Sequence, residues 1–153
     1  MTRNRRQKTA IRAHQAATET TYLNARRRQL SWPALAKVME QHEKLNDFGI
    51  GVFNPLRMTA EQRRAELAAD REKLLRSEDL VTKTGLWLRD NITPIKTPTA
   101  GSYTVKHVME QATGAYATNG VFIAAALIVG YTFRYDPPNV RFGMSERDLN
   151  RLR

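Results

Sequence analysis

The chain has 153 residues, a length that suits one ordinary domain with a single core and is too short for two. It contains no cysteine, which excludes disulfides, thiol nucleophiles and zinc–thiolate sites and makes the cytoplasm the expected location. Its 41% hydrophobic content predicts a folded protein, and its net charge of +10 predicts an acidic partner or nucleic acid.

Positive charge is concentrated at the N-terminus. Residues 1–30 contain eight basic side chains and one acidic side chain, Glu19, which gives them a net +7 of the chain's +10. Arginine dominates this cluster, and its planar guanidinium matches the geometry of a phosphate group. No apolar stretch follows that would make the segment a secretory signal. The most apolar run, Val121–Val129, is about half the length that a bilayer requires, so we expect it in the core and expect no membrane partner.

The N-terminal segment predicts two short helices, residues 7–17 and 22–30, separated by Thr18–Thr21, which have weak helix propensity. Residues 17–27 resemble the turn and recognition helix of helix-turn-helix repressors, although Glu19 stands where those proteins have glycine. The resemblance implies a reading helix in the major groove and a homodimer. The alternative is a basic amphipathic arm that docks on the protein itself or extends into solvent. Such an arm can also bind phosphate but does not read bases, and both interpretations stay open.

Both interpretations predict nucleic-acid contacts from the same segment. Phosphate contacts are expected from Arg3, Arg5, Arg6, Lys8 and Arg12. Asparagine and arginine can address adenine and guanine edges, and a tyrosine can stack on a base. Under the helix-turn-helix interpretation, base contacts are therefore expected from Tyr22, Asn24, Arg26, Arg27 and Arg28.

Three further helices are predicted before residue 91. Ser31 is a good N-cap for the first, whose apolar residues recur at helical spacing as far as Leu45. Residues 47–57 hold two glycines and a proline and predict a loop or a short strand. Residues 59–76 begin with a capping-box signature, and a third helix spans residues 78–90. Its expected buried face comprises Leu80, Thr84, Trp87 and Leu88.

The C-terminal part predicts a linker, three helices and a hairpin. Residues 91–101 hold two prolines and three threonines and predict a hinge. A helix capped by Ser102 and the apolar helix 121–129, capped by Thr118 or Asn119, follow. Residues 131–142 then predict a β-hairpin, and Ser145 caps a short final helix.

Residues 102–145 carry the motifs SYxxKHxxE, YxxNGxFIxAAxxxG and PNxxFxMS. In these motifs the chain resembles a group of small proteins from bacterial plasmids, prophages and integrative elements. The likeness covers about a third of the chain. It implies mobile DNA as the setting and no particular reaction.

The same motifs contain the candidate polar site, Tyr103, Lys106, His107, Glu110, Tyr116 and Asn119. Because His107 and Lys106 lie three and four residues before Glu110, the three side chains share one helix face. A catalytic interpretation uses His107 as general base and Lys106 as electrophile. We favour an exposed ion pair with a neighbouring histidine, since no second acid or nucleophile converges on the site.

Metal and nucleotide cofactors are not expected. The histidines His14, His42 and His107 are far apart in sequence and form no ligand set. The two-glycine segment at residues 49–51 has no accompanying lysine and matches no nucleotide-binding loop.

The sequence therefore predicts a mainly α protein. We expect a single compact helical domain, residues 31–153, with a short β-hairpin near the C-terminus and a basic N-terminal helical element, residues 1–30. The expected function is a DNA-binding accessory or regulatory protein of a mobile genetic element, with DNA preferred to RNA. The alternatives are a mobile-element inhibitor that binds a host protein or ribonucleoprotein, and an enzyme that uses the polar site.

Overall fold

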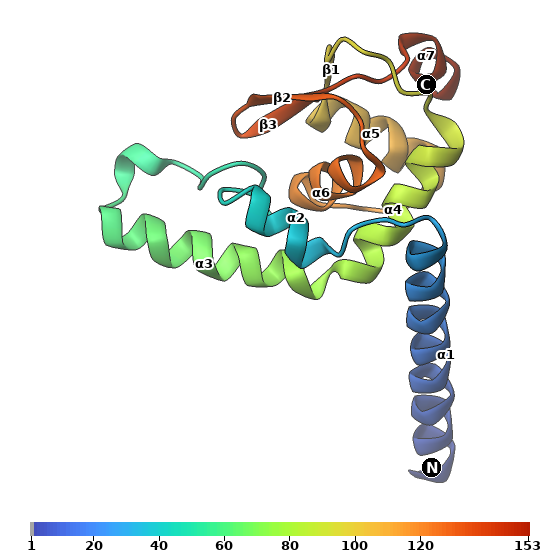
Figure 1. The fold of residues 1–153 in the computed structure, drawn as a ribbon. Coiled ribbons are helices and arrows are strands. Elements are labelled where there is room, and N and C mark those ends of the chain that lie inside the picture. Colours follow the sequence, from blue (N-terminus) through green and yellow to red (C-terminus); the bar gives the residue numbers. More distant parts are fainter. Residues whose placement is uncertain (1) are drawn as a thin grey trace. The chain divides into compact units, whose positions relative to one another are not determined.

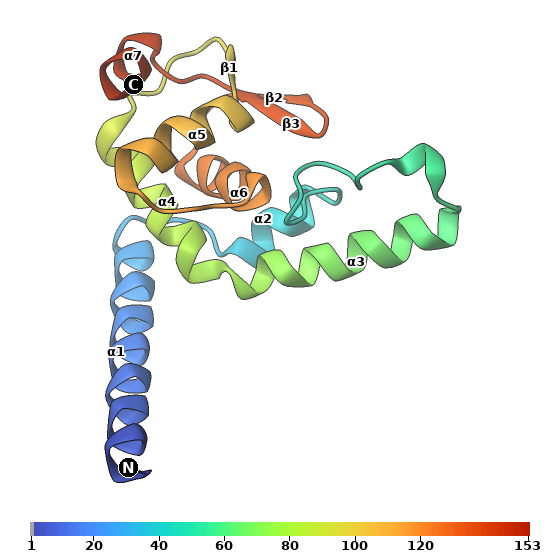
Figure 2. The ribbon, with the colours of Figure 1, turned by 180° about the vertical axis from the view of Figure 1, so that it is seen from behind.

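The computed structural model describes the backbone of residues 2–153, which Figures 1 and 2 draw as a ribbon. Side chains are described from residue 5 onward. Contacts divide the chain into two units, Met1–Trp32 and Pro33–Arg153. The fold is mainly α with one small antiparallel sheet near the C-terminus, which confirms the predicted class.

The first unit consists mostly of a single helix, α1 (Thr2–Gln29). The turn predicted at residues 18–21 is therefore wrong, because the helix continues through it. The hydroxyls of Thr18 and Thr21 each donate a hydrogen bond of 2.9 Å to the carbonyl oxygen one turn earlier. These bonds satisfy the threonine hydroxyls inside the helix. The propensity cost of threonine is below about 0.7 kcal/mol per residue, too small to break a helix flanked by alanines.

Ser31 ends α1 instead of capping the next helix, so the predicted N-cap is wrong. Its φ of 55° lies in the left-handed region, as at the residue that follows many helices. The N–H groups of Ser31 and Trp32 donate to the carbonyl oxygens of Arg28 and Arg27, both at 3.0 Å. These two bonds form a Schellman motif, which closes the helix with a polar residue in the position that glycine usually takes.

The second unit holds six further α-helices, one short 3-10 helix and three strands. The α-helices are α2 (Leu35–Gln41), α3 (Ala60–Arg76), α4 (Glu78–Asn91), α5 (Ser102–Thr113), α6 (Asn119–Val129) and α7 (Glu146–Leu152). The 3-10 helix is η1 (Pro55–Arg57), and the strands are β1 (Ala100–Gly101), β2 (Phe133–Asp136) and β3 (Asn139–Phe142).

Helix starts in this unit follow local capping chemistry. The predicted capping box is confirmed, since Thr59 and Gln62 exchange side-chain-to-backbone hydrogen bonds at the start of α3. The hydroxyls of Thr118 and Ser145 accept backbone N–H groups at the starts of α6 and α7, as predicted. Helix α5 differs, because Ser102 is its first helical residue and makes no cap.

Helix α6 forms the centre of the second unit. It packs against α2, α4, α5 and β3, which surround it in Figure 1. Phe122 is fully buried and meets the ring of Phe142 edge to face, with ring centroids 6.5 Å apart. On α4, Thr84 and Leu88 are buried as predicted, whereas Leu80 and Trp87 are half-buried and Val81 takes the inner position. The apolar run Val121–Val129 is thus a core segment, as expected.

The three strands form a sheet in the order β1-β3-β2, with both pairings antiparallel. Strands β2 and β3 form the predicted hairpin, and β1 pairs Ala100 with Phe142. Residues 91–101, predicted as a hinge, thus lie inside the second unit. Two further hydrogen bonds hold this segment to residues near the C-terminus. The N–H of Thr93 donates to Asp148 Oδ2 at 2.8 Å, and the N–H of Ile95 donates to the carbonyl oxygen of Gly143 at 2.9 Å.

Candidate functional site

The N-terminal half of α1 presents basic side chains to solvent. Every side chain from Arg5 to Glu19 is exposed, and no acidic residue precedes Glu19 in the sequence. The basic members form what we call the basic helix face, Arg5, Arg6, Lys8 and Arg12. Arg5, Lys8 and Arg12 are spaced by three and four residues and therefore share one side of the helix. The side chain of Arg3, also predicted to contact phosphate, lies outside the described side chains.

The residues predicted to contact bases lie on the C-terminal half of the same helix. Tyr22 is exposed, and Asn24 is half-buried. Arg26 donates a 2.7 Å hydrogen bond to Gln29 Oε1. Arg26, Arg27 and Arg28 occupy the last turn, where positive charge interacts favourably with the carbonyl end of the helix dipole. The structure therefore has no separate reading helix in the described part of this unit.

The second unit gathers all six residues of the predicted polar site, here called the polar cluster, around one cavity of about 670 Å³. Lys106 is only 5% exposed. Its Nζ atom lies 2.8 Å from Glu110 Oε1 and 5.4 Å and 5.3 Å from the ring centroids of Tyr103 and Tyr116. The predicted exposed ion pair is therefore wrong for Lys106. Helical spacing places Lys106 beside Glu110 but gives no sign that Tyr116, in the loop after α5, lies near the ammonium.

Glu110 accepts three hydrogen bonds within the cluster. The donors are Lys106, the backbone N–H of Ala117 at 3.2 Å, and His107 Nδ1 at 3.1 Å. Desolvation acts to raise the pKa of Glu110, but these hydrogen bonds and the charge of Lys106 outweigh it and lower the pKa. His107 remains about half exposed, and its ring meets that of Tyr103 edge to face at 4.4 Å.

Asn119 connects the polar cluster to the hairpin. Its Oδ1 accepts a 3.0 Å bond from the hydroxyl of Ser102, and its Nδ2 donates a 2.9 Å bond to Asn139 Oδ1. The Ser102 hydroxyl in turn accepts the N–H of Val140 at 3.2 Å. The amide is thus held by α5, α6 and β3 together, which fits a structural role in joining these elements.

This arrangement changes the catalytic interpretation of the cluster. Lys106 is buried and ion-paired with Glu110, so its ammonium group already has a carboxylate partner and is not free in the cavity as the catalytic interpretation requires. The His107–Glu110 pair is one acid–base group that a molecule in the cavity could meet. Two acidic residues on the cavity wall, Asp47 and Asp70, were missed because they come from distant segments.

The described residues give no geometric sign of a metal site. Among them, no three or more histidine and acidic side chains come close enough together to share an ion. Within the same part of the chain, every helix is too short or too polar to cross a bilayer.

Comparisons of the chain with protein-family models, curated proteins and solved structures found no match. The resemblance of residues 102–145 to mobile-element proteins therefore stays a prediction.

Proposed function

We propose that this protein binds nucleic acid, with DNA preferred, through the basic helix face of α1. The observation that carries the proposal is the exposure of Arg5, Arg6, Lys8 and Arg12 on a helix segment that contains no acidic residue before Glu19. Phosphate contacts by arginine and lysine supply most of the affinity of non-specific binding and steer the encounter. A purely solubilising charge would be spread over the chain instead of placed in one segment.

A continuous α1 favours binding by one helix that lies along the major groove over binding by a helix-turn-helix. The 28 residues of α1 extend about 42 Å at the usual rise per residue. The major groove is about 12 Å wide and admits a helix, and continuous basic helices can lie along it. In this mode the basic helix face contacts phosphates, and Tyr22, Asn24 and Arg28 are the candidates for base contacts. Because α1 lacks the turn, the proposal does not include a helix-turn-helix.

The setting is a separate part of the proposal. The motifs of residues 102–145 resemble those of plasmid and prophage proteins, so we propose an accessory or regulatory role on mobile DNA. The folded second unit would then serve as the part that other components recognise. This setting rests on resemblance alone, and binding can be tested without it.

The test is fluorescence anisotropy of a labelled random-sequence duplex across a salt series. We expect the unaltered protein to give a log–log salt slope of about −4 to −6, which corresponds to about five or six neutralised phosphates. Replacing Arg5, Arg6, Lys8 and Arg12 by glutamine should reduce the slope by about three to four, because four counterion-releasing contacts are lost. Duplex RNA and single-stranded DNA of equal length test the preference for duplex DNA.

The matched control neutralises four exposed basic residues of the second unit, Lys37, Lys96, Arg134 and Arg147. It makes the same change in net charge, so an equal loss of affinity would show that total charge, and not α1, governs binding. If the unaltered protein binds no nucleic acid, the proposal fails, and the basic helix face is then assigned to an acidic protein partner, as in the inhibitor hypothesis.

A further inference from the structure

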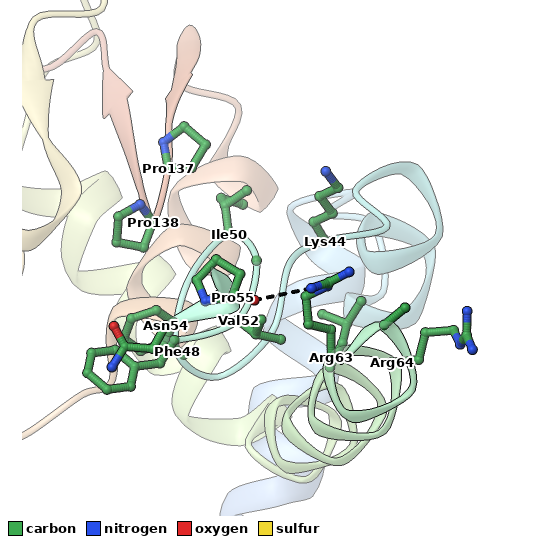
Figure 3. A pocket seen from close by; sticks show the side chains of 14 residues that line it. Lys44, Phe48, Ile50, Val52, Asn54, Pro55, Arg63, Arg64, Pro137 and Pro138 are labelled. Atoms are coloured by element: carbon green, nitrogen blue, oxygen red, sulfur yellow. Dashed lines mark hydrogen bonds between the residues drawn. The ribbon is translucent and has the colours of Figure 1, made fainter. Parts of the chain in front are cut away.

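A second cavity, of about 780 Å³, adjoins the cavity of the polar cluster in the second unit and shares Phe48 and Pro138 with it; Figure 3 shows this second cavity. Three segments far apart in the sequence build its walls, residues 44–55, residues 60–67 of α3, and Pro137–Pro138 of the hairpin turn. Its lining is mostly apolar and includes Phe48, Ile50, Val52 and Leu67. We call this cavity the apolar pocket. Its volume falls in the range of cavities that bind ligands.

The pocket is held in shape by hydrogen bonds between its walls. The N–H of Ile50 donates to the carbonyl of Pro138 at 2.9 Å. Arg63 Nη1 donates to the carbonyls of Pro55 and Met58 at 3.2 Å and 2.8 Å, and the first of these bonds is dashed in Figure 3. Gly49 has a φ of 146°, and a Cβ there would overlap the Pro138 carbonyl, so the loop reaches the hairpin only with glycine at this position. The pocket is therefore preformed.

The charge of the pocket has one sign. Its lining includes three basic side chains, Lys44, Arg63 and Arg64, and no acidic one. In Figure 3 these three lie on one side of the cavity, and Phe48, Pro137 and Pro138 lie on the other. Lys44 and Arg64 are exposed. An occupant with an apolar surface and negative charge along one edge complements this arrangement.

Apolar surface is exposed both in the pocket wall and beside it. Phe53, a lining residue, is 58% exposed and packs edge to face on Phe48, with ring centroids 5.6 Å apart. Leu56, in η1, lies outside the lining and is 99% exposed. Exposed apolar side chains beside a pocket with a polar rim mark protein-binding surfaces, because a small ligand would leave them in water.

From these observations we propose that the apolar pocket, with Phe53 and Leu56, is a docking site for an amphipathic segment of a partner protein that carries acidic residues beside its apolar face. Large apolar side chains of the segment fill the cavity, and its carboxylates pair with Lys44 and Arg64. The site lies wholly in the second unit, so the proposal does not depend on nucleic-acid binding by α1.

The test selects partners from a displayed library of random peptides of about 16 residues, long enough for about four helical turns. The full-length protein is the bait. We expect the enriched peptides to contain large apolar residues at helical spacing and more acidic than basic residues. A synthetic copy of the most enriched peptide should bind the double variant Phe53→Asp, Leu56→Asp at least about tenfold more weakly, as hot-spot residues do. Both replaced side chains are exposed, so the variant keeps the core intact.

Charge is tested with a second double variant, Lys44→Glu and Arg64→Glu. This variant should bind the acidic peptide about threefold to tenfold more weakly than the unaltered protein, with the larger loss of affinity at low salt. The matched control, Lys37→Glu and Arg134→Glu, makes the same charge change at exposed positions outside the pocket and should leave binding unchanged.

Several results would overturn the proposal. One is enriched peptides that carry net positive charge, and another is equal binding to the Phe53→Asp, Leu56→Asp variant. A selection that yields no peptide also overturns it. Binding of anilinonaphthalene sulfonate in that case would reassign the pocket to a small apolar anion.

Discussion

The Nζ atom of Lys106 lies 2.8 Å from Oε1 of Glu110, and within 5.4 Å of the ring centroids of two tyrosines. Replacing Lys106 by methionine keeps most of the side-chain volume but leaves the Glu110 carboxylate without its main partner. We expect a loss of about 3–5 kcal/mol in the free energy of unfolding, measured by urea denaturation. Adding Glu110→Gln should recover part of the loss, because the unpaired charge is then gone. Lys37→Met, at an exposed position, is the control and should stay within about 0.5 kcal/mol.

We expect His42 to make the stability of the protein depend on pH. Its Nδ1 atom forms a hydrogen bond with the hydroxyl of Tyr135, and burial lowers the pKa of His42 below its ordinary value of 6.5. The unfolded chain therefore takes up the proton at a higher pH than the folded chain. The contribution of His42 to the free energy of unfolding should therefore be fully present above pH 6.5. It should be lost as the pH falls from there through the lowered pKa of the folded state.

The measurement is the free energy of unfolding between about pH 7 and about pH 5, where histidine titrates. His42→Gln should flatten this dependence, and His14→Gln, at an exposed position of α1, should leave it unchanged. An equally steep profile in the His42→Gln protein would contradict the assignment.

Helix α1 should be sensitive to proline at the position where a turn was predicted. Proline in a helix interior costs about 3 kcal/mol, because it removes a backbone hydrogen bond and clashes with the preceding turn. Thr18→Pro should therefore lower the helical circular dichroism signal and weaken DNA binding several-fold, whereas Thr18→Ala should preserve both. A Thr18→Pro protein with unchanged helicity would argue for a break at residues 18–21.

Gly120 should tolerate no side chain. A Cβ at this position would overlap the carbonyl oxygen of Asn46 and the backbone of Asp47. Gly120→Ala should destabilise the protein by about 1–3 kcal/mol, since the loop must move away from α6. At Gly101 a Cβ would meet only Thr104 Oγ1, at 4.0 Å, so Gly101→Ala should be close to neutral. Denaturation of the two variants under the same conditions compares them, and equal stabilities would contradict the packing argument.

Local chemistry explains which elements could be predicted from the sequence. The caps at Thr59 and Ser145, and Thr118 as one of the two candidates for α6, could be predicted because a cap is a bond between residues two or three apart. The turn of the hairpin was predicted for the same reason, from Pro137 and Pro138. Strand β1 was missed, since its two residues pair with β3 about 40 positions later and carry no periodicity of their own.

Competing local signals explain the errors in the first unit. Serine is a favourable N-cap, but Ser31 can also follow the end of the preceding helix. Because α1 continues to Gln29, Ser31 takes the second role and adopts a left-handed conformation just after the helix. Threonines at residues 18–21 favour a turn only weakly, and continuous helix formation outweighs that preference.

The candidate sites also differ in whether they depend on local sequence or on tertiary contacts. The basic helix face could be predicted from the sequence, because a cluster of basic residues on an exposed helix needs no tertiary contact. The burial of Lys106 and the apolar pocket could not, because each depends on segments that meet only in the folded chain. Gly49 and Pro138, for example, are almost 90 residues apart and yet are in contact.

Helix α6 has consequences for synthesis of the chain. Its apolar side chains are covered by α2, α4 and α5, which precede it, and by β3, which follows it. A nascent chain that ends before Phe142 therefore exposes part of the most apolar segment in the protein. Premature termination or proteolysis within the hairpin should therefore produce fragments that aggregate and need chaperones.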